Sequence, residues 1–268
     1  MSILDLNKYE TIFIDMDGVI LMQERLIPKA DEALKELRNC ADVYILSNND
    51  TKTRNLIADK LCKFGLNLQP STIINSAFIL AKHLMEQHGT SKVFVLGEKG
   101  LRSELEAYGH ELVQPAEAEV IAVGTERNIT YKKFDRALTA LLKGAKFYVA
   151  NADETFPTGS GEAPGAGAVV GGIKGMGFIP NKYVCKPSVT AGETAMEIAG
   201  VTNPRNCLLI GDRLEVDILM AQKLGMDSAL VLTGAENRDS LEDSQIHPTY
   251  SFESLSELIR SNYLDTIG

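Results

Sequence analysis

The sequence predicts an α/β protein, with helices on both faces of a parallel sheet and a second α/β domain inserted into the first. Apolar runs of strand length alternate with helical stretches along most of the chain. The alternation restarts near residue 90, and the first pattern returns near residue 183 after a stretch rich in glycine and small residues. We therefore expect a core domain formed by residues 1–80 and 182–268, with residues 81–181 inserted as a second domain.

Local sequence features mark the elements of the first core segment. Pro28 suits the first turn of a helix, Thr51 is a suitable N-cap, and Gly65 is a typical helix stop. Apolar runs between these helices have the length of strands. In chain order we expect a strand at 9–14, a helix at 28–38, a strand at 43–46, a helix at 51–64, a strand at 72–74 and a helix from Ser76.

The inserted segment has its own alternation, after which the core pattern resumes. Residues 158–177 are so rich in glycine that we expect a loop or a crossing between domains there. Before this loop the expected elements are strands at 93–96, 120–123 and 147–150 and helices at 101–108 and 130–142. After it they are strands at 183–185, 207–210 and 229–232 and helices at 189–199 and 216–224.

The composition of the chain excludes several classes of function. The chain has 268 residues, a net charge of −9 and 44% apolar residues. The acidic balance argues against partners that need a basic surface, so we expect neither nucleic-acid nor membrane binding. Four widely spaced cysteines without a CxxC pattern predict neither disulfides nor zinc. With no signal-peptide pattern and no apolar span of membrane length, a cytoplasmic location is expected.

The most informative segment is an apolar strand that ends in two carboxylates, Asp15 and Asp17, followed by Gly18. Alternate residues of a strand share a face, so both carboxylates can approach one point, where a hard cation such as Mg²⁺ would relieve their repulsion. An ordinary Asp-Gly turn is the bland alternative. An EF-hand loop is excluded, because its glycine would be at position 4 and Leu26 would replace the glutamate at position 12.

A second polar segment, Ser47-Asn48-Asn49, follows the strand at 43–46. A hydroxyl, amide side chains and main-chain N–H groups near a helix start can hold a phosphate group. Serine and asparagine also favour turns and caps, and taken alone this structural interpretation is the stronger one.

Two further strand ends carry charged groups. Lys186 follows the apolar run at 183–185, where it is placed to neutralise a phosphate or a carboxylate cluster. Asp212 follows the strand at 207–210, and Asp217 lies near the start of the next helix, where a helix-capping role is equally suitable. All four polar strand ends are carboxyl ends, the edge at which parallel sheets bind ligands.

Together these residues suit phosphoryl transfer. Asp15, ionised at neutral pH, would attack phosphorus and form an aspartyl phosphate, while Asp17 would protonate the leaving alkoxide and then activate water. Mg²⁺ would be held by Asp15, Asp212 and the main-chain carbonyl of Asp17. The phosphoryl oxygens would be held by Ser47, Asn48, Asn49 and Lys186, with Asp217 supporting the metal's ligands or orienting Lys186.

These segments, in this order, resemble the haloacid dehalogenase (HAD) superfamily of phosphatases. Within it the chain is similar to the NagD-like, p-nitrophenylphosphatase-type branch. The resemblance covers nearly the whole chain and is carried by Asp15-Met16-Asp17-Gly18-Val19, Ser47-Asn48-Asn49, Lys186-Pro187-Ser188 and Gly211-Asp212-Arg213. It implies a Rossmann-like parallel-sheet core with a large inserted α/β cap, a Mg²⁺ cofactor, and a homodimer formed through the caps.

The resemblance also implies a small phosphomonoester as substrate, selected by the cap. Glycerol phosphate or a phosphoglycolate-like acid is the first choice, with sugar phosphates, pyridoxal phosphate and nucleoside monophosphates as further candidates. Glu126, Arg127, Asn151 and Asp153 follow expected cap strands, although an ordinary solvated loop is the preferred interpretation of each.

Two other functions compete with hydrolysis. A phosphotransferase or mutase would pass the phosphoryl group from Asp15 to a second hydroxyl rather than to water. A receiver-like signalling module would use Asp15 as its phosphorylated aspartate, but such a module has no need of an inserted domain of about a hundred residues.

Overall fold

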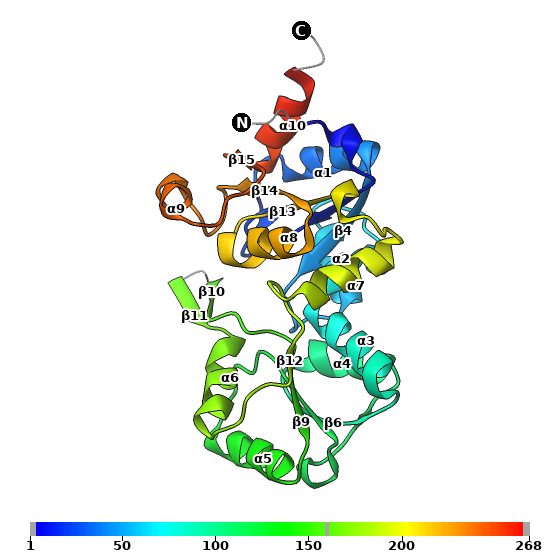
Figure 1. Cartoon of the computed structure of the whole chain (residues 1–268), viewed down its shortest axis with the longest axis vertical. Helices are drawn as coiled ribbons and strands as arrows, with labels where there is room; N and C mark the ends of the chain where they lie inside the picture. The colour runs from blue at the N-terminus through cyan, green and yellow to red at the C-terminus, as the bar shows by residue number, and fades with distance from the viewer. Residues whose placement is uncertain (1–3, 159–160, 265–268) are drawn as a thin grey trace. The chain divides into compact units, whose positions relative to one another are not determined.

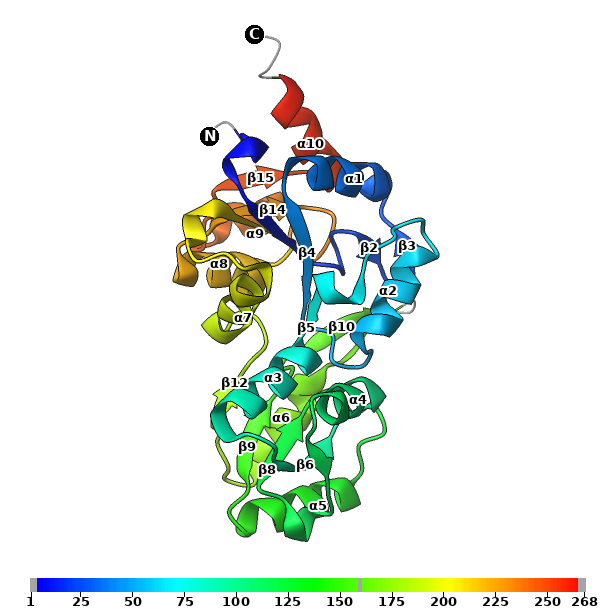
Figure 2. The ribbon, with the colours of Figure 1, turned by 90° about the vertical axis from the view of Figure 1, so that its right-hand side faces the viewer.

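The computed structural model describes residues 4–158 and 161–264, and within it the chain forms two compact units (Figures 1 and 2). The first unit comprises residues 4–47, 58–74 and 186–264. The second comprises Asn48–Ile57 and Asn75–Cys185. The expected insertion, 81–181, lies wholly within the second unit, which also includes ten residues that directly follow Ser47. The short ends 1–3 and 265–268 of the expected core lie outside the described residues.

The first unit is built on a six-stranded sheet with the strand order β15-β14-β13-β1-β4-β5. β1 pairs in parallel with both β4 and β13, and β13 with β14. The strands are β1 (Thr11–Ile14), β4 (Asp42–Ser47), β5 (Ile73–Asn75), β13 (Cys207–Gly211), β14 (Asp227–Val231) and β15 (Tyr250–Phe252). A small antiparallel pair, β2 (Leu21–Met22) and β3 (Arg25–Leu26), follows the first strand.

Helices cover both faces of this sheet. The connections β1–α1–β4 and β13–α8–β14 step in opposite directions along the strand order, so right-handed crossovers place α1 and α8 on opposite faces. α1 packs against α10, and α7 packs against α8. The helices are α1 (Ala30–Cys40), α2 (Arg54–Cys62), α7 (Val189–Ala199), α8 (Leu219–Leu224), α9 (Arg238–Asp243) and α10 (Leu255–Leu264), with a π-helical turn at Leu214–Ile218 before α8.

The second unit has a five-stranded sheet of its own, in the order β12-β9-β8-β6-β7, whose pairs are parallel. Its core lies between this sheet, α5 and α6, around Phe94, Ile121, Phe147 and Val169. The strands are β6 (Lys92–Leu96), β7 (Glu111–Leu112), β8 (Val120–Val123), β9 (Lys146–Val149) and β12 (Lys182–Tyr183), with the hairpin β10 (Thr155–Thr158) and β11 (Gly161–Pro164). The helices are α3 (Ser76–His88), α4 (Lys99–Ala107), α5 (Tyr131–Leu142) and α6 (Ala166–Gly175).

The predicted α/β class is confirmed, and three local predictions were wrong. α2 begins at Arg54 rather than Thr51, because the Asn49 side chain accepts hydrogen bonds from the main-chain N–H groups of Thr51 and Lys52 and makes a turn there. The strand after the glycine-rich stretch, β12, pairs with β9 and so belongs to the second sheet rather than the core.

The third difference concerns the glycine-rich stretch itself, of which residues 159–160 lie outside the described part. Residues 161–164 form β11 and Ala166–Gly175 form α6, where a loop was expected. Burial explains the helix: Val169, Val170 and Ile173 pack into the core of the second unit, and this contact outweighs the poor helix propensity of glycine.

Candidate active site

Two of the predicted aspartates follow neighbouring parallel strands at the point where the strand order reverses. Asp15 follows β1 and Asp212 follows β13, whose last paired residues are Ile14 and Ile210. From β1 the chain steps to β4, and from β13 it steps the opposite way to β14. Carboxyl ends of parallel strands at such a reversal form a crevice, which makes this edge the expected ligand site.

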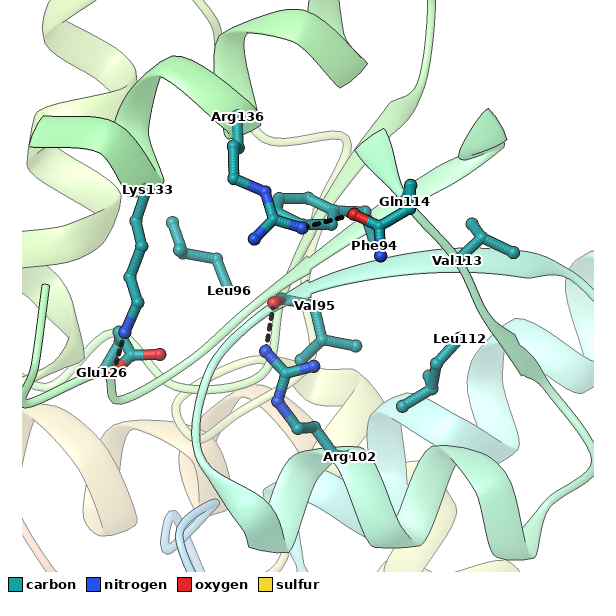
Figure 3. A pocket seen from close by; sticks show the side chains of 10 residues that line it. All are labelled: Phe94, Val95, Leu96, Arg102, Leu112, Val113, Gln114, Glu126, Lys133 and Arg136. Atoms are coloured by element: carbon teal, nitrogen blue, oxygen red, sulfur yellow. Dashed lines mark hydrogen bonds and ion pairs between the residues drawn. The ribbon is translucent and has the colours of Figure 1, made fainter. Parts of the chain in front are cut away.

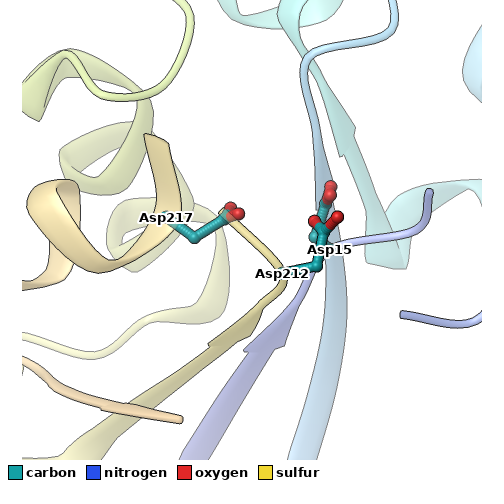
Figure 4. Close-up of side chains that lie close together, drawn as sticks. All are labelled: Asp15, Asp212 and Asp217. Atoms are coloured by element: carbon teal, nitrogen blue, oxygen red, sulfur yellow. The ribbon is translucent and has the colours of Figure 1, made fainter. Parts of the chain in front are cut away.

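Three carboxylates meet at this edge (Figure 4). Asp15, Asp212 and Asp217 each offer an oxygen, and these oxygens lie within 4.8 Å of one another. All three side chains are buried, and Asp217 has no exposed surface at all. Like charges so close together in a buried place repel one another strongly, so the cluster needs positive charge beside it.

Lys186 supplies part of that charge. Its Nζ donates to Asp15 Oδ1 at 2.9 Å and to Asp217 Oδ1 at 2.6 Å, and the residue is only 3% exposed. Burial by itself lowers the pKa of Lys186, but the two carboxylates outweigh burial and raise the pKa above its ordinary value. The lysine therefore stays charged and holds the two aspartates together.

Lys186 offsets only part of the negative charge of the three carboxylates, and the pKa values of Asp15 and Asp212 are raised as a result of burial and of the neighbouring carboxylates. Burial raises the pKa of Asp15 well above its ordinary value; Lys186 opposes this rise, and the carboxylates of Asp217, Asp212 and Asp17 add to it. Burial and Asp217 raise the pKa of Asp212 to about 7. The expectation that Asp15 is simply ionised at neutral pH therefore does not follow from these groups alone, and a cation bound beside them would favour the ionised form.

The donor set fits a divalent cation. Asp212 Oδ2 accepts from the main-chain N–H of Ala235 at 2.8 Å, but its Oδ1 is buried and has no hydrogen-bond partner among the residues that the structure describes. An unsatisfied buried carboxylate oxygen costs free energy, and hard divalent cations bind such oxygens. The three carboxylates that meet are Asp15, Asp212 and Asp217. The predicted set counted Asp17 through its main-chain carbonyl, and that role stays a prediction.

Glycines allow the main chain to approach Asp212 closely. A Cβ at Gly18, whose φ is +85°, would lie 2.2 Å from Asp212 Oδ2, and one at Gly234 would lie 1.9 Å from it. Thr233 Oγ1 donates to the Gly18 carbonyl at 2.6 Å and joins the two loops. Thr233, Gly234 and Ala235 were not identified from the sequence. They follow β14 (Asp227–Val231) along the chain, so the search for polar or small residues after a strand would have found them.

The second predicted segment divides between the units. Ser47 is the buried last residue of β4, beside β1 in the first unit. Asn48 and Asn49 belong to the second unit. There the Asn48 carbonyl accepts from Ser76 Oγ at 2.8 Å, and Asn48 Nδ2 donates to Asp153 Oδ1 at 3.3 Å. The Asn49 side-chain oxygen is used by the turn before α2.

The four predicted cap residues all have partners within the second unit. Glu126 pairs with Lys133 at 3.0 Å. Arg127 Nε donates to Glu98 Oε1 at 2.7 Å. Asn151 and Asp153 are hydrogen-bonded to one another, since Asp153 N donates to Asn151 Oδ1 at 2.8 Å.

The second unit also contains a pocket of about 190 Å³ near the edge of its sheet (Figure 3). Three cations line it, and each is already hydrogen-bonded. Arg102 Nη2 donates to the Val95 carbonyl at 2.7 Å, Arg136 Nη2 to Gln114 Oε1 at 2.8 Å, and Lys133 pairs with Glu126. The pocket is thus lined by apolar side chains and by three cations that are held by hydrogen bonds or ion pairs within the unit.

Within the described part of the chain, no helix has both the length and the apolar character needed to cross a membrane.

Comparison with known proteins gives consistent matches to phosphatases. A family model described as haloacid dehalogenase-like hydrolase matches residues 12–111, and a HAD-hydrolase-like model matches residues 184–258. Among curated proteins, the 5'-nucleotidase YutF of Bacillus subtilis is 31% identical over 95% of this chain and 99% of that protein. The sugar-phosphatase AraL of the same species is 32% identical over 93% of this chain and 92% of that protein.

Solved structures agree. The p-nitrophenyl phosphatase from Archaeoglobus fulgidus is 32% identical, with a TM-score of 0.90, over 94% of this chain and 99% of that one. The 4-nitrophenylphosphatase from Thermotoga maritima is 27% identical, with a TM-score of 0.91, over 96% of this chain and 98% of that one. The chain therefore belongs to the haloacid dehalogenase-like hydrolases, as a phosphatase of their NagD-like, p-nitrophenylphosphatase-type branch.

Proposed function

We propose that this phosphatase hydrolyses a small phosphomonoester with the help of Mg²⁺, through an aspartyl phosphate formed on Asp15. One observation carries the proposal. A buried group of carboxylates bridged by Lys186 lies at the reversal point of a parallel sheet, and within the described part of the chain one oxygen of Asp212 has no hydrogen-bond partner. Such an arrangement is unfavourable for stability alone and suits a cation and a phosphate.

Asp15, Asp212 and the main-chain carbonyl of Asp17 would hold the cation. When bound, it supplies positive charge that lets Asp15 ionise and screens the carboxylate from the incoming phosphate. The contacts of Lys186 with Asp15 and Asp217 support a role for Asp217 in orienting the lysine.

The proposed reaction has two steps. An oxygen of Asp15 forms a bond to phosphorus as the bond from phosphorus to the leaving oxygen breaks, and Asp17 gives its proton to that oxygen. Asp17 then takes a proton from water, whose oxygen attacks phosphorus as the bond to Asp15 breaks. The products are an alcohol and inorganic phosphate, and Asp15 is regenerated.

The phosphoryl oxygens would be held by Ser47, the amide of Asn48, Asn49 and Lys186. The charge of Lys186 and the buried hydroxyl at the end of β4 support this assignment. Asn49 would contribute through an N–H group, because a phosphoryl oxygen accepts hydrogen bonds and the Asn49 side-chain oxygen itself accepts within the turn.

The substrate is a small phosphorylated metabolite. The relatives named above are a 5'-nucleotidase, a sugar phosphatase and p-nitrophenyl phosphatases. These names support nucleoside monophosphates and sugar phosphates as candidates beside glycerol phosphate, phosphoglycolate and pyridoxal phosphate. We propose that residues 81–181 act as the substrate-selecting cap and the remainder as the catalytic core.

Phosphate release from this panel, with p-nitrophenyl phosphate as a common reference, tests the proposal. We expect release with Mg²⁺, none after EDTA dialysis, and a loss of at least ~10³-fold in kcat for Asp15→Asn, because the nucleophile is gone. Activity that survives EDTA would refute the metal role, and near-normal turnover of the variant would remove Asp15 as nucleophile. Phosphorylated alcohol formed without free phosphate would identify a transferase.

We also propose a homodimer formed through the second unit. Among the described residues, the large apolar side chains that are most exposed are Leu56, Tyr131, Leu142 and Ile179, and all four lie in this unit. Sedimentation should give a dimer that Tyr131→Glu with Leu142→Glu converts to monomers, whereas a monomeric parent protein would refute the proposal.

A further inference from the structure

Asp50 is a buried carboxylate that the reaction does not use. It has no exposed surface, and its oxygens accept from Thr125 N at 2.6 Å, Thr125 Oγ1 at 2.7 Å and Asn151 Nδ2 at 3.3 Å. Thr125 follows β8 and Asn151 follows β9, so one side chain fastens the segment after Ser47 to two strand ends of the second unit. A Cβ at Gly124 would lie 1.9 Å from Asp50 Oδ2, which shows how closely that main chain approaches.

The hydrogen bonds continue from Asp50 back to the start of its own segment. Asn151 Oδ1 accepts from Asp153 N at 2.8 Å, and Asp153 Oδ1 accepts from Asn48 Nδ2 at 3.3 Å. Hydrogen bonds thus link Asp50 through Asn151 and Asp153 to Asn48, and the main chain from Asn48 to Asp50 closes a ring, here called the Asp50 ring. Ser76 Oγ, which donates to the Asn48 carbonyl at 2.8 Å, holds the same residue from another direction.

The two carboxylate oxygens accept from all three donors. Burial raises the pKa of Asp50 above its ordinary value, and the hydrogen bonds from Thr125 and Asn151 only partly oppose this rise. An asparagine would turn an N–H₂ group toward Thr125 or Asn151, donor against donor, in a place without access to water. The ring therefore depends on aspartate at this position.

We propose that Asp50 is a positioning residue for substrate phosphate: through the Asp50 ring it holds Asn48 in place. The inference rests on the proposed function, which assigns the amide of Asn48 to a phosphoryl oxygen. When the Asp50 ring is broken, the segment from Asn48 to Asp50 samples more conformations. We therefore expect weaker phosphate binding first, and only a smaller effect on the rate of the chemical step.

The test compares Asp50→Asn with Glu104→Gln in the Mg²⁺-loaded enzyme. Glu104 is also a buried carboxylate of the second unit, and it accepts from Arg54 N at 2.9 Å and Arg54 Nε at 3.3 Å, outside the ring. We expect Asp50→Asn to raise KM and the inhibition constant of inorganic phosphate by ~10-fold with a smaller change in kcat. Glu104→Gln should lower Tm about as much as Asp50→Asn does. Its KM and its inhibition constant for inorganic phosphate should stay near those of the parent protein.

Asn48→Ala, and the double variant that combines it with Asp50→Asn, distinguish a positioning role of Asp50 from a general loss of stability. Asp50→Asn and Asn48→Ala open the same ring. The double variant should therefore bind phosphate no more weakly than the single variant that binds it more weakly. Effects that add, or an Asp50→Asn variant that binds phosphate like Glu104→Gln, would overturn the inference. Should Asp50→Asn fail to fold, Thr125→Val removes a single donor to Asp50 and should give the same pattern at smaller size.

Ser47→Ala reports on the underlying proposal independently. If it weakens phosphate inhibition while Asp50→Asn does not, the phosphate-binding segment stands and the role of Asp50 falls. If neither Ser47→Ala nor Asn48→Ala changes the inhibition constant, the phosphate-binding assignment itself is wrong, and the inference falls with it.

Discussion

At the scale of single residues, the structure shows how one lysine and three aspartates share a small buried space. Asp15, Lys186 and Asp212 could be identified in the sequence because each follows an apolar run of strand length, and Asp217 because it lies near the start of the next helix. Their charge states were not, since the pKa of Asp15 depends on the burial and partners that the fold creates. Lys186 illustrates this: a lysine after a strand is ordinarily solvated, and here two carboxylates enclose it.

Asp17 offers a test based on the leaving group. Asp17→Asn should lower kcat/KM by about 10²- to 10⁴-fold for an alkyl phosphate, whose alkoxide needs a proton. For p-nitrophenyl phosphate the loss should be clearly smaller, because that leaving group departs unprotonated. The two values of kcat/KM, measured side by side, decide the matter; equal losses would count against Asp17 as the acid.

The Glu98–Arg127 pair gives a pH prediction. The hydrogen bond from Arg127 holds the pKa of Glu98 below its ordinary value, although burial opposes this. A lowered pKa in the folded state means that the pair stabilises the protein above the unfolded value of about 4.3 and loses this effect as the pH falls through the folded value. The stability advantage over Glu98→Gln, under about 1 kcal/mol for so exposed a pair, should be present at pH 7 and vanish in acid. An advantage that grows on acidification would contradict it.

At the scale of elements, burial decided what local propensity could not. Helix α6 forms from a glycine-rich stretch because its apolar side chains enter the core of the second unit. The predicted start of α2 failed for the opposite reason, since one side chain, Asn49, stabilises a turn that competes with the helix. Strands and helices with clear apolar periodicity, such as β13 and α5, were predicted to within one or two residues.

Two adjacent glycines of α6 should respond in opposite ways to alanine. Gly171 has open space where a Cβ would be, so Gly171→Ala should raise the free energy of unfolding by about 0.5–1 kcal/mol. A Cβ at Gly172 would lie 2.5 Å from Cζ of Phe134, so Gly172→Ala should lower it by about 1–3 kcal/mol. Urea denaturation of both variants measures this, and changes of the same sign would contradict the packing described for α6.

At the scale of the whole molecule, the proposed binding of Mg²⁺ by the carboxylate cluster would link metal binding to stability. Mg²⁺ that binds the folded state stabilises it, by about 2.7 kcal/mol at a hundred times its Kd. Thermal unfolding should therefore move to higher temperature with Mg²⁺, and Asp212→Asn should remove most of this shift. A shift of full size in the variant would place the cation elsewhere.

The sequence by itself determined the α/β class, the family and the residues that line the strand ends, because periodicity and short motifs are local properties. Only the tertiary structure decided the partners. Lys186 meets Asp15 across 171 positions and Asp50 meets Thr125 across 75, and a local pattern carries no information about such pairings. The assignment of Asn48 to the second unit was decided in the same way, since its neighbours in space, Ser76 and Asp153, lie far along the chain. Buried polar groups must find partners wherever the fold brings donors and acceptors together, and that requirement is met only in three dimensions.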